Sequence, residues 1–192
     1  EEEEKQEYMK IVSSNNELLL QLIDDILDLS KIEAGTMEFT FAPTDINELM
    51  EGICRQMQEK NTSPDVAITF TEKATECIFH TDRVRLSQVI INFTNNAMKF
   101  TSEGSIQMGY RIDETKDEIY FYVKDTGIGI PADKIDEVFE RFVKLNTFAK
   151  GTGLGLAICR VIVERLEGTI GANSREGEGS CFWFRLPMHQ KV

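Results

Sequence analysis

The sequence predicts an α/β protein: a two-layer α/β sandwich with helices on one face of a mixed sheet, preceded by a long bundle-forming helix. Residues 1–33 carry apolar side chains at three- and four-residue steps without a proline, which is typical of one amphipathic helix. Residues 104–112 and 117–125 alternate apolar and polar side chains, as strands do. Helical and strand patterns then follow one another along the chain, which favours layered packing.

Composition excludes several classes of protein. The 192 residues, 41% of them hydrophobic, suffice for one full domain plus an appendage. The formal net charge of -12 argues against duplex nucleic acid or an anionic membrane as the main partner. It leaves room for a nucleotide, because a few local cations and a metal ion can hold a triphosphate. No run of about 18 apolar residues is present, and the leading EEEEKQEYMK does not resemble a signal peptide. The cysteines lack zinc-site spacing, so we expect buried, reduced thiols at Cys54, Cys77, Cys159 and Cys181.

The first unit, residues 1–36, is the long helix and its end. Its apolar stripe is wider than a two-helix seam and fits a helical hairpin or a four-helix bundle. Gly35 is well placed to cap the C-terminus. Alone, the stripe would face water, so we expect it to pair with a helix outside this sequence or with a second copy. The stripe consists of Met9, Val12, Leu19, Leu22, Ile23, Ile26, Leu29 and Ile32.

The second unit, residues 37–192, is the α/β domain. Asp45, after Thr44, and Asp82 are expected helix caps, and Gly168 is the expected end of the last helix. Phe139 and Phe142 stand at helical spacing and are expected in the core. The predicted helices are 46–60, 83–100, 131–142 and 153–168, and the predicted strands are 37–43, 66–72, 76–80, 104–112, 117–125, 168–174 and 179–187.

Polar side chains line one edge of the predicted helix 83–100. At about 100° per residue, Asn92, Asn96 and Lys99 lie within about 60° of one another. Asn96 can hold Mg²⁺ through its carbonyl oxygen while Lys99 offsets phosphate charge. On this helix alone, a solvated polar face is the better explanation.

Two glycine-containing segments follow. In DTGIGIP, Asp125 ends a strand and can accept a hydrogen bond from an exocyclic amine such as that of adenine, and the glycines at 127 and 129 let a flat ring approach the backbone. An ordinary Asp-Gly turn is the alternative. In GTGLGLAI, residues 151–158, three alternate glycines lead into a helix N-terminus, a natural anion site. The dinucleotide-binding fingerprint needs a different spacing after a strand.

In this order the segments resemble the ATP-binding domain of sensor histidine kinases. An N-x-x-x-N-A-x-K-F helix, D-x-G-x-G-I, F-x-x-F and G-T-G-L-G-L all fall within residues 92–156. The segment LIDDILDLSKIEAGTMEF, residues 22–39, resembles the second helix of the dimerisation hairpin and its linker. The stretch RFVKLNTFAKGTGLGL is similar to hybrid-type bacterial sensor kinases. The resemblance implies two domains, 1–36 and 37–192.

The resemblance also implies the roles of the site residues. Asp125 would recognise adenine, Asn96 would hold Mg²⁺, and Asn92 and Lys99 would contact metal or phosphates. Lys144 stands where the family often carries an arginine that reaches the γ-phosphate; lysine keeps the charge but loses the forked geometry. Residues 151–155 would be the glycine hinge of an ATP lid, and 145–150 a compact lid that moves without nucleotide. The implied catalytic residues are Asn92, Lys99 and Lys144, and the implied nucleotide site is Asn92, Asn96, Lys99, Phe100, Asp125, Gly127, Gly129, Ile130, Lys144, Gly151, Thr152, Gly153, Leu154, Gly155 and Leu156.

The residue type at position 92 helps to distinguish phosphoryl transfer from ATP hydrolysis. The related gyrase, chaperone and mismatch-repair ATPases carry a glutamate at this position, one turn before the metal-binding asparagine, where it activates water. An amide is not usefully basic, so Asn92 favours phosphoryl transfer over hydrolysis. The family's acceptor is a histidine on the first dimerisation helix. Neither His80 nor His189 lies on the bundle helix, so we expect a fragment of a larger kinase.

The implied partners are ATP, the phosphoacceptor helix, the receiver domain of a response regulator, and a second copy through the bundle helix. The implied location is cytoplasmic, in a parent anchored in the inner membrane. Two alternatives remain open: a natural split protein or pseudokinase that only senses ATP, and a scaffold or dimerisation module. The related serine kinases of anti-anti-sigma factors share the nucleotide motifs, but the helix at 5–33 argues against them.

Overall fold

The computed structural model describes residues 2–143 and 151–188. Lys144, the predicted lid 145–150 and His189 therefore lie outside the described residues. The elements are α1 (Glu2–Glu33), β1 (Ala42–Asp45), α2 (Ile46–Lys60), β2 (Val66–Glu72), β3 (Ile78–Thr81), α3 (Arg83–Phe100), β4 (Gly104–Asp113), β5 (Glu118–Asp125), the 3-10 helix η1 (Ala132–Glu137), α4 (Gly155–Arg165), β6 (Thr169–Arg175) and β7 (Gly179–Pro187).

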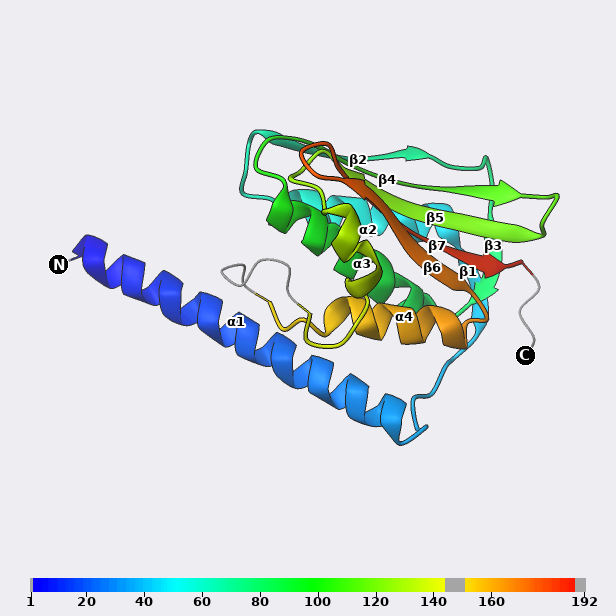
Figure 1. The fold of residues 1–192 in the computed structure, drawn as a ribbon, viewed down its shortest axis with the longest axis horizontal. Coiled ribbons are helices and arrows are strands. Elements are labelled where there is room, and N and C mark those ends of the chain that lie inside the picture. Colours follow the sequence, from blue (N-terminus) through cyan, green and yellow to red (C-terminus); the bar gives the residue numbers. More distant parts are fainter. Residues whose placement is uncertain (1, 144–150, 189–192) are drawn as a thin grey trace.

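The main sheet has five strands in the order β2-β4-β5-β7-β6, and helices α2, α3 and α4 cover one of its faces (Figure 1). The pair β2–β4 is parallel and the other three pairs are antiparallel, so the sheet is mixed, as predicted. The hairpins β4–β5 and β6–β7 join neighbouring strands through short turns. Strands β1 and β3 form a separate antiparallel pair. The predicted two-layer sandwich is confirmed.

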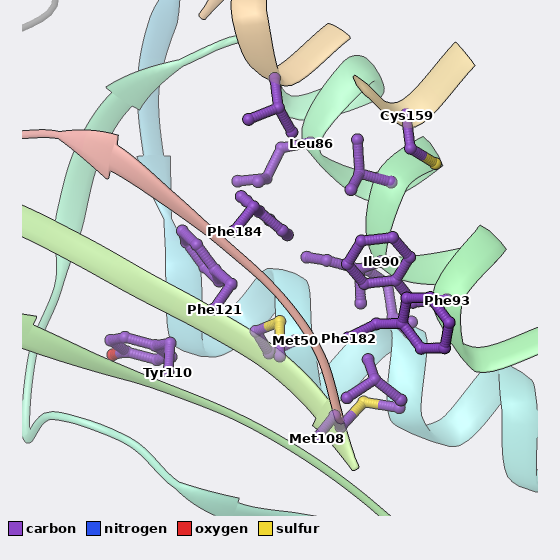
Figure 2. Close-up of a cluster of buried hydrophobic side chains, with 14 of the residues drawn as sticks. Met50, Leu86, Ile90, Phe93, Met108, Tyr110, Phe121, Cys159, Phe182 and Phe184 are labelled. Atoms are coloured by element: carbon purple, nitrogen blue, oxygen red, sulfur yellow. The ribbon is translucent and has the colours of Figure 1, made fainter. Parts of the chain in front are cut away.

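The core lies between the sheet and its helices, where alternate strand residues meet apolar side chains of α2, α3 and α4 (Figure 2). The ring of Phe121 on β5 stacks on that of Phe184 on β7, with centroids 4.8 Å apart. Phe93 of α3 meets Phe182 and Phe184 at 5.5 and 6.0 Å. Such pairs contribute about 0.5–1.5 kcal/mol each beyond the burial of their area. They hold α3 against the sheet and so fix the polar edge of this helix.

Both predicted helix caps are confirmed. The Asp45 carboxylate accepts from the Glu48 amide at 3.1 Å. Asp82 accepts from the amides of Val84 and Arg85, both at 2.9 Å, and caps α3. A side-chain cap of this kind stabilises a helix by about 1 kcal/mol. The local signal therefore sets where α3 begins, and hence the height of its polar residues above the sheet.

Helix α1 is confirmed, and it lies on the side of α4 that faces away from the sheet (Figure 1). Gly35 follows it with a φ of 67°, as its predicted capping role requires. Only part of the predicted stripe is covered: Leu29 and Ile32 pack against the core. A wide apolar face of α1 remains exposed, formed by Tyr8, Met9, Ile11, Val12, Leu19, Leu20, Ile23, Ile26 and Leu27.

The predicted strand at 37–43 is wrong. Residues 36–41 have no regular structure, and β1 begins only at Ala42. The Asp82 carboxylate takes the amide of Thr40 at 2.7 Å, so this backbone donor serves the α3 cap rather than a sheet. Pro43 lies within β1, which has one neighbour only, so its missing N–H leaves no ladder bond unmade.

The predicted helix at 131–142 is also wrong. Only η1 forms, and Phe142, expected in the core, is 68% exposed with a φ of 63°. Its amide donates to the carbonyl of Gly153 at 2.9 Å, so the chain turns here to meet the glycine-rich loop instead of continuing a helix. Phe139 does pack against the core, edge-on to Phe182.

The end of the last helix differs from the prediction as well. Helix α4 stops at Arg165, and the left-handed residue after it is Glu167, with a φ of 58°, rather than Gly168. The Gly168 amide still closes the turn by donating to the Val163 carbonyl at 2.8 Å. Gly168 is needed for a different reason: a Cβ there would overlap the carbonyl of Arg185 on β7.

The four cysteines are free, and Cys54, Cys77 and Cys159 are buried, as predicted. The prediction is wrong for Cys181, which is only half-buried because it alternates with the core residues Phe182 and Phe184 and so faces the open side of the sheet. Burial raises the pKa of the Cys54, Cys77 and Cys159 thiols, which keeps them protonated at neutral pH.

In the described part of the chain, no helix has both the length and the apolar character that crossing a membrane requires.

Candidate nucleotide-binding site

The polar edge of α3 is present as predicted. The Asn96 side-chain nitrogen donates to the Asn92 carbonyl oxygen at 3.2 Å, and both side chains are half-buried. Lys99, one turn further on, is exposed, and its ammonium lies 4.9 Å from the centre of the Phe100 ring. Two carboxamides and a cation are therefore aligned along α3.

Asp125 is buried at the end of β5, with 4% of its surface exposed. Its Oδ1 accepts from the amides of Gly127 at 2.9 Å and Ser180 at 3.2 Å. Burial raises the pKa of the carboxyl, and the two amide bonds partly oppose this. Within residues 2–143 and 151–188, Oδ2 accepts no hydrogen bond, so one oxygen of a fixed carboxylate is available to an amine donor.

The loop after Asp125 closes against the end of α3. The amide of Ile128 donates to the Phe100 carbonyl at 3.2 Å. A Cβ on Gly127 would overlap that same carbonyl and lie 2.8 Å from Thr101 Oγ1. Only glycine fits this approach, so the D-x-G-x-G segment and the end of the N-x-x-x-N-A-x-K-F helix are held in direct contact.

Gly129 and Ile130 complete this loop. Gly129 has a φ of 68°, and a Cβ there would overlap the carbonyl of Arg175 on β6. The Ile130 amide donates to Ser174 Oγ at 2.8 Å, and the Ile130 side chain is buried. The second glycine of the motif thus lets the loop pack on the β6–β7 hairpin, which in turn supplies the Ser180 amide to Asp125.

Thr101 is a residue that the sequence reasoning missed. It is 4% exposed, and its Oγ1 is buried with no hydrogen-bond partner among the described residues. A buried hydroxyl left unpaired costs about 1–3 kcal/mol. Thr81 Oγ1 and Trp183 Nε1 are unpaired in the same way, but Thr101 Oγ1 lies against Gly127 of the Asp125 loop, which makes it a candidate site residue. Its position directly after Phe100, at the C-terminus of α3, was the only signal in the sequence.

The glycine-rich loop lies along the same edge of α3, from Asn92 in the middle of the helix to Lys99 near its C-terminus. A Cβ on Gly155 would overlap the Asn92 side-chain amide, and a Cβ on Gly151 would lie 3.0 Å from Lys99 Nζ. Gly151 and Gly153 have φ values of 148° and 74°, which other residues rarely adopt. Leu154 is fully buried and anchors the loop, and Leu156 packs beside the core.

The three predicted motifs therefore meet around α3, although they are far apart in the chain. Its C-terminal end, at Phe100 and Thr101, contacts the Asp125 loop, and its edge from Asn92 to Lys99 contacts residues 151–155. The arrangement combines an amine acceptor, a glycine-lined approach, amide oxygens, a cation and the N-terminus of α4. These groups match the adenine and phosphate ends of a nucleotide. Of the predicted site residues, Lys144 alone lies outside the described ranges.

Comparison with known proteins agrees with this geometry. Residues 81–190 match the family model described as "Histidine kinase-, DNA gyrase B-, and HSP90-like ATPase". The chain is 35% identical, over 97% of its length, to hybrid signal transduction histidine kinase K of Dictyostelium discoideum. It is 36% identical, over 96%, to the circadian input-output histidine kinase CikA of Synechococcus elongatus. It spans only 17% and 25% of the lengths of these two relatives.

Two solved structures share the fold over nearly the whole chain. Full-length ShkA in complex with AMPPNP superposes with a TM-score of 0.85 at 28% identity, covering 98% of this chain and 40% of ShkA. The histidine kinase ThkA in complex with the response regulator protein TrrA gives a TM-score of 0.75 at 26% identity, covering 95% of this chain and 51% of ThkA. The family model covers more than half of the chain, from the start of α3 to beyond β7. The chain therefore belongs to the histidine kinase-, DNA gyrase B- and HSP90-like ATPase family, as the catalytic ATP-binding domain of a sensor histidine kinase.

Proposed function

We propose that this chain binds ATP with Mg²⁺ and transfers the γ-phosphoryl group to a histidine on a dimerisation helix, for relay to an aspartate of a response regulator. The observation that carries the proposal is the meeting of three motifs on α3. Gly127 contacts the end of the helix at Phe100, while Gly155 and Gly151 contact Asn92 and Lys99. This contact defines an adenine end and a phosphate end of one site.

At the adenine end, Asp125 Oδ2 accepts a hydrogen bond from the exocyclic amine. The carboxylate cannot rotate freely, because Oδ1 is held by the Gly127 and Ser180 amides. The unpaired hydroxyl of Thr101 lies beside the same loop. It donates a hydrogen bond to a ring nitrogen of adenine or to a bridging water. Together these groups select adenine over guanine, whose corresponding ring position is a carbonyl.

At the phosphate end, the groups present fit a magnesium ion shared with a triphosphate. Asn96 uses its side-chain nitrogen toward Asn92, so its carbonyl oxygen remains for a metal. Among the described residues no cluster of three or more histidine, cysteine, aspartate or glutamate side chains can form a metal site, so the phosphates supply further ligands. When bound, Mg²⁺ neutralises charge that develops on the phosphoryl oxygens.

The protein groups at this end favour transfer to another side chain. Lys99 offsets phosphate charge, and the loop before α4 offers backbone N–H groups. Lys144 is proposed to reach the γ-phosphate. Asn92 stands where a water-activating base would be needed, and an amide cannot remove a proton. Bound ATP therefore persists until a stronger nucleophile, such as an imidazole, is brought to it.

The acceptor histidine is proposed to reside on a helix that packs against α1. The exposed apolar face of α1 is wide enough for a bundle of helices, and in the parent protein a second copy of α1 completes it. His80 is not a candidate acceptor, because it sits in β3 with its ring stacked on Phe41. In this proposal residues 1–36 are the second helix of the dimerisation hairpin, and residues 37–192 are the catalytic domain.

The test combines binding with transfer. The chain is titrated calorimetrically with AMPPNP, with and without Mg²⁺, and is then incubated with γ-labelled ATP, alone and with a polypeptide carrying the first bundle helix of the parent kinase. We expect Mg²⁺-dependent binding, no labelling of this chain, and labelling of the added helix at its histidine. Changing that histidine to glutamine removes the label and is the matched control.

Two outcomes support the alternatives instead. Binding of AMPPNP without labelling of the added helix identifies a pseudokinase that senses ATP. Absence of binding in every condition identifies a scaffold module and overturns the nucleotide site. Steady release of inorganic phosphate without the added helix would show that hydrolysis does not need a base at position 92, and would overturn the transferase assignment.

A further inference from the structure

Helix α1 holds the glycine-rich loop through a residue that belongs to none of the motifs. Asp25 is 5% exposed and lies where α1 packs against α4. Its Oδ2 accepts a hydrogen bond from Thr152 Oγ1 at 2.5 Å, and its Oδ1 accepts one from Gln21 Nε2 at 2.8 Å. Thr152 stands between Gly151 and Gly153. Helix α1, which lies outside the sandwich, is therefore hydrogen-bonded directly to the proposed phosphate end of the site.

Thr152 transmits this contact to the start of α4. Its Oγ1 also accepts from the Leu154 amide at 3.2 Å. With the hydroxyl hydrogen directed at Asp25, the lone pairs of the oxygen face the Leu154 N–H. The N–H groups at the beginning of a helix have no partner within the helix, and they are the donors that a phosphate group uses. Thr152, held in place by Asp25, thus occupies one of these donors.

The charge of Asp25 acts in the same direction. Besides burial, which is the larger cause, the nearby Asp25 carboxylate raises the pKa of the Cys159 thiol, at the start of the second turn of α4. An anion close to a helix N-terminus is stabilised by the helix dipole. A triphosphate at the glycine-rich loop would bring more negative charge toward the same helix end, and buried charges are screened only weakly by salt.

The other described polar contacts of α1 do not involve residues 151–155 themselves. Asp28 accepts from Gln88 Nε2 at 2.7 Å and lies 3.3 Å from Arg85 Nη1, both at the start of α3. Glu33 pairs with Arg141 at 2.5 Å. The Asp28 contacts dock α1 on α3 without touching the glycine-rich loop, whereas Arg141 precedes Phe142, whose amide donates to the Gly153 carbonyl at 2.9 Å. Among the described residues, the Asp25–Thr152 bond is the direct side-chain contact between α1 and the glycine-rich loop.

We propose that Asp25 is a positioning residue for the glycine-rich loop, and that docking of α1 through the Asp25–Thr152 hydrogen bond opposes the binding of an adenine nucleoside triphosphate. The inference rests on the proposed nucleotide site. Coupling between two binding events is reciprocal: if release of α1 strengthens nucleotide binding by some factor, nucleotide weakens α1 docking by the same factor. Movement of α1 is then a direct control on the occupancy of the site.

The first arm of the test measures affinity. The 192-residue chain is titrated calorimetrically with AMPPNP and Mg²⁺ as wild type, Asp25→Asn and Asp24→Asn. Asp24 is exposed on the same turn of α1, so its variant makes the same change of charge without touching Thr152. We expect AMPPNP to bind Asp25→Asn at least about five-fold more tightly than wild type, and Asp24→Asn to bind it as wild type does.

The second arm reads the reverse direction of the coupling. Hydrogen–deuterium exchange of residues 19–33 and 151–158 is followed with and without AMPPNP. In wild type we expect nucleotide to increase exchange in α1. In Asp25→Asn, exchange in α1 is already raised, and nucleotide adds little. A purely structural role for Asp25 would raise exchange in the variant but leave AMPPNP affinity unchanged or weaker.

Each result decides the matter. Tighter binding by Asp25→Asn, together with nucleotide-dependent exchange in wild-type α1, supports the coupling. Unchanged or weaker binding by a variant that melts at the wild-type temperature overturns the coupling and leaves the nucleotide site standing. Absence of AMPPNP binding by both wild type and Asp25→Asn overturns the proposed site itself, and the coupling falls with it.

Discussion

Asn96 donates its side-chain nitrogen to the carbonyl oxygen of Asn92 across one turn of α3, at 3.2 Å. This hydrogen bond leaves a different group available on each of the two side-chain amides. Asn96 keeps a free carbonyl oxygen, which suits a hard metal ion, and Asn92 keeps free N–H donors, which suit a phosphate. Neither of these remaining groups has another hydrogen-bond partner within the described ranges. The pair is therefore prepared for a metal–phosphate ligand.

Changing Asn96→Ala should remove Mg²⁺-dependent nucleotide binding. In the proposed site the lost amide oxygen is a direct metal ligand, so we expect calorimetric affinity for AMPPNP with Mg²⁺ to fall by at least about 100-fold. The melting temperature should stay near that of wild type. Asn95→Ala is the control, because Asn95 faces α2 and accepts from Lys60 at 3.2 Å. If Asn96→Ala unfolds the domain, Asn96 is structural and the metal assignment is wrong.

Changing Asp125→Asn should weaken adenine recognition without harming the fold. The new amide nitrogen would face the adenine amine, so we expect the affinity for ATP analogues to fall about 10- to 100-fold, while that for GTP analogues does not fall. Stability should rise or stay level at neutral pH. Burial raises the pKa of Asp125 above its unfolded value, so the folded state disfavours the charged form, and stability is lost as pH rises through that pKa. Thermal unfolding of both proteins at neutral pH checks this sign.

Thr101→Val should separate a ligand contact from a structural one. The Oγ1 atoms of Thr101 and Thr81 are both buried without a partner among the described residues, so valine removes an unpaired group of equal shape in each case. We expect neither variant to lose stability in urea unfolding. Only Thr101→Val should lose AMPPNP affinity, because Thr81 lies on β3, away from the Asp125 loop. Equal affinities for the two variants would exclude Thr101 from the site.

Gly129→Ala and Gly177→Ala should separate backbone strain from steric overlap. Both glycines have a positive φ, 68° and 79°, which costs a residue with a Cβ about 1–2 kcal/mol. At Gly177 the added Cβ meets nothing within 4 Å, whereas at Gly129 it overlaps the Arg175 carbonyl. We expect Gly129→Ala to lower the free energy of unfolding by at least about 1 kcal/mol more than Gly177→Ala. Urea unfolding of both variants measures the difference, and equal losses would contradict it.

Alkaline pH should destabilise the domain partly through Tyr110. Burial raises the pKa of this phenol to about 12, from an ordinary value of 10.0, and its hydroxyl donates to Asn47 at 2.7 Å. The folded state therefore holds the proton more tightly, so this contribution is complete below pH 10 and is lost as pH rises toward 12, at up to about 1.4 kcal/mol per pH unit. Tyr110→Phe should be less stable by about 1 kcal/mol at neutral pH and should show a shallower alkaline decline. Part of the slope remains in this variant, because Tyr120, Tyr122 and the cysteines also have raised pKa values.

Much of the fold and site could be predicted because the signals are local. Asp82 and Asp45 cap helices through bonds to amides two or three residues away, and the alternation in β4 and β5 fixes which side chains enter the core. The order of the motifs, from Asn92 to Gly155, indicated one nucleotide site. Where the prediction failed, local pattern competed with tertiary demand. Phe142 stands at helical spacing in the sequence, but its amide is taken by Gly153.

By itself, the sequence determined the starts of α2 and α3, the hairpins β4–β5 and β6–β7, the glycine positions and the residue types of the proposed adenine and phosphate ends. Only the tertiary structure decided which side chains meet. Thr101 is a candidate site residue because Gly127 packs against it. Asp25 lies 127 positions before Thr152, and their hydrogen bond exists because α1 docks on α4. Periodicity reports which face of a helix is apolar, but not which element covers that face, because that choice depends on the packing of the whole chain.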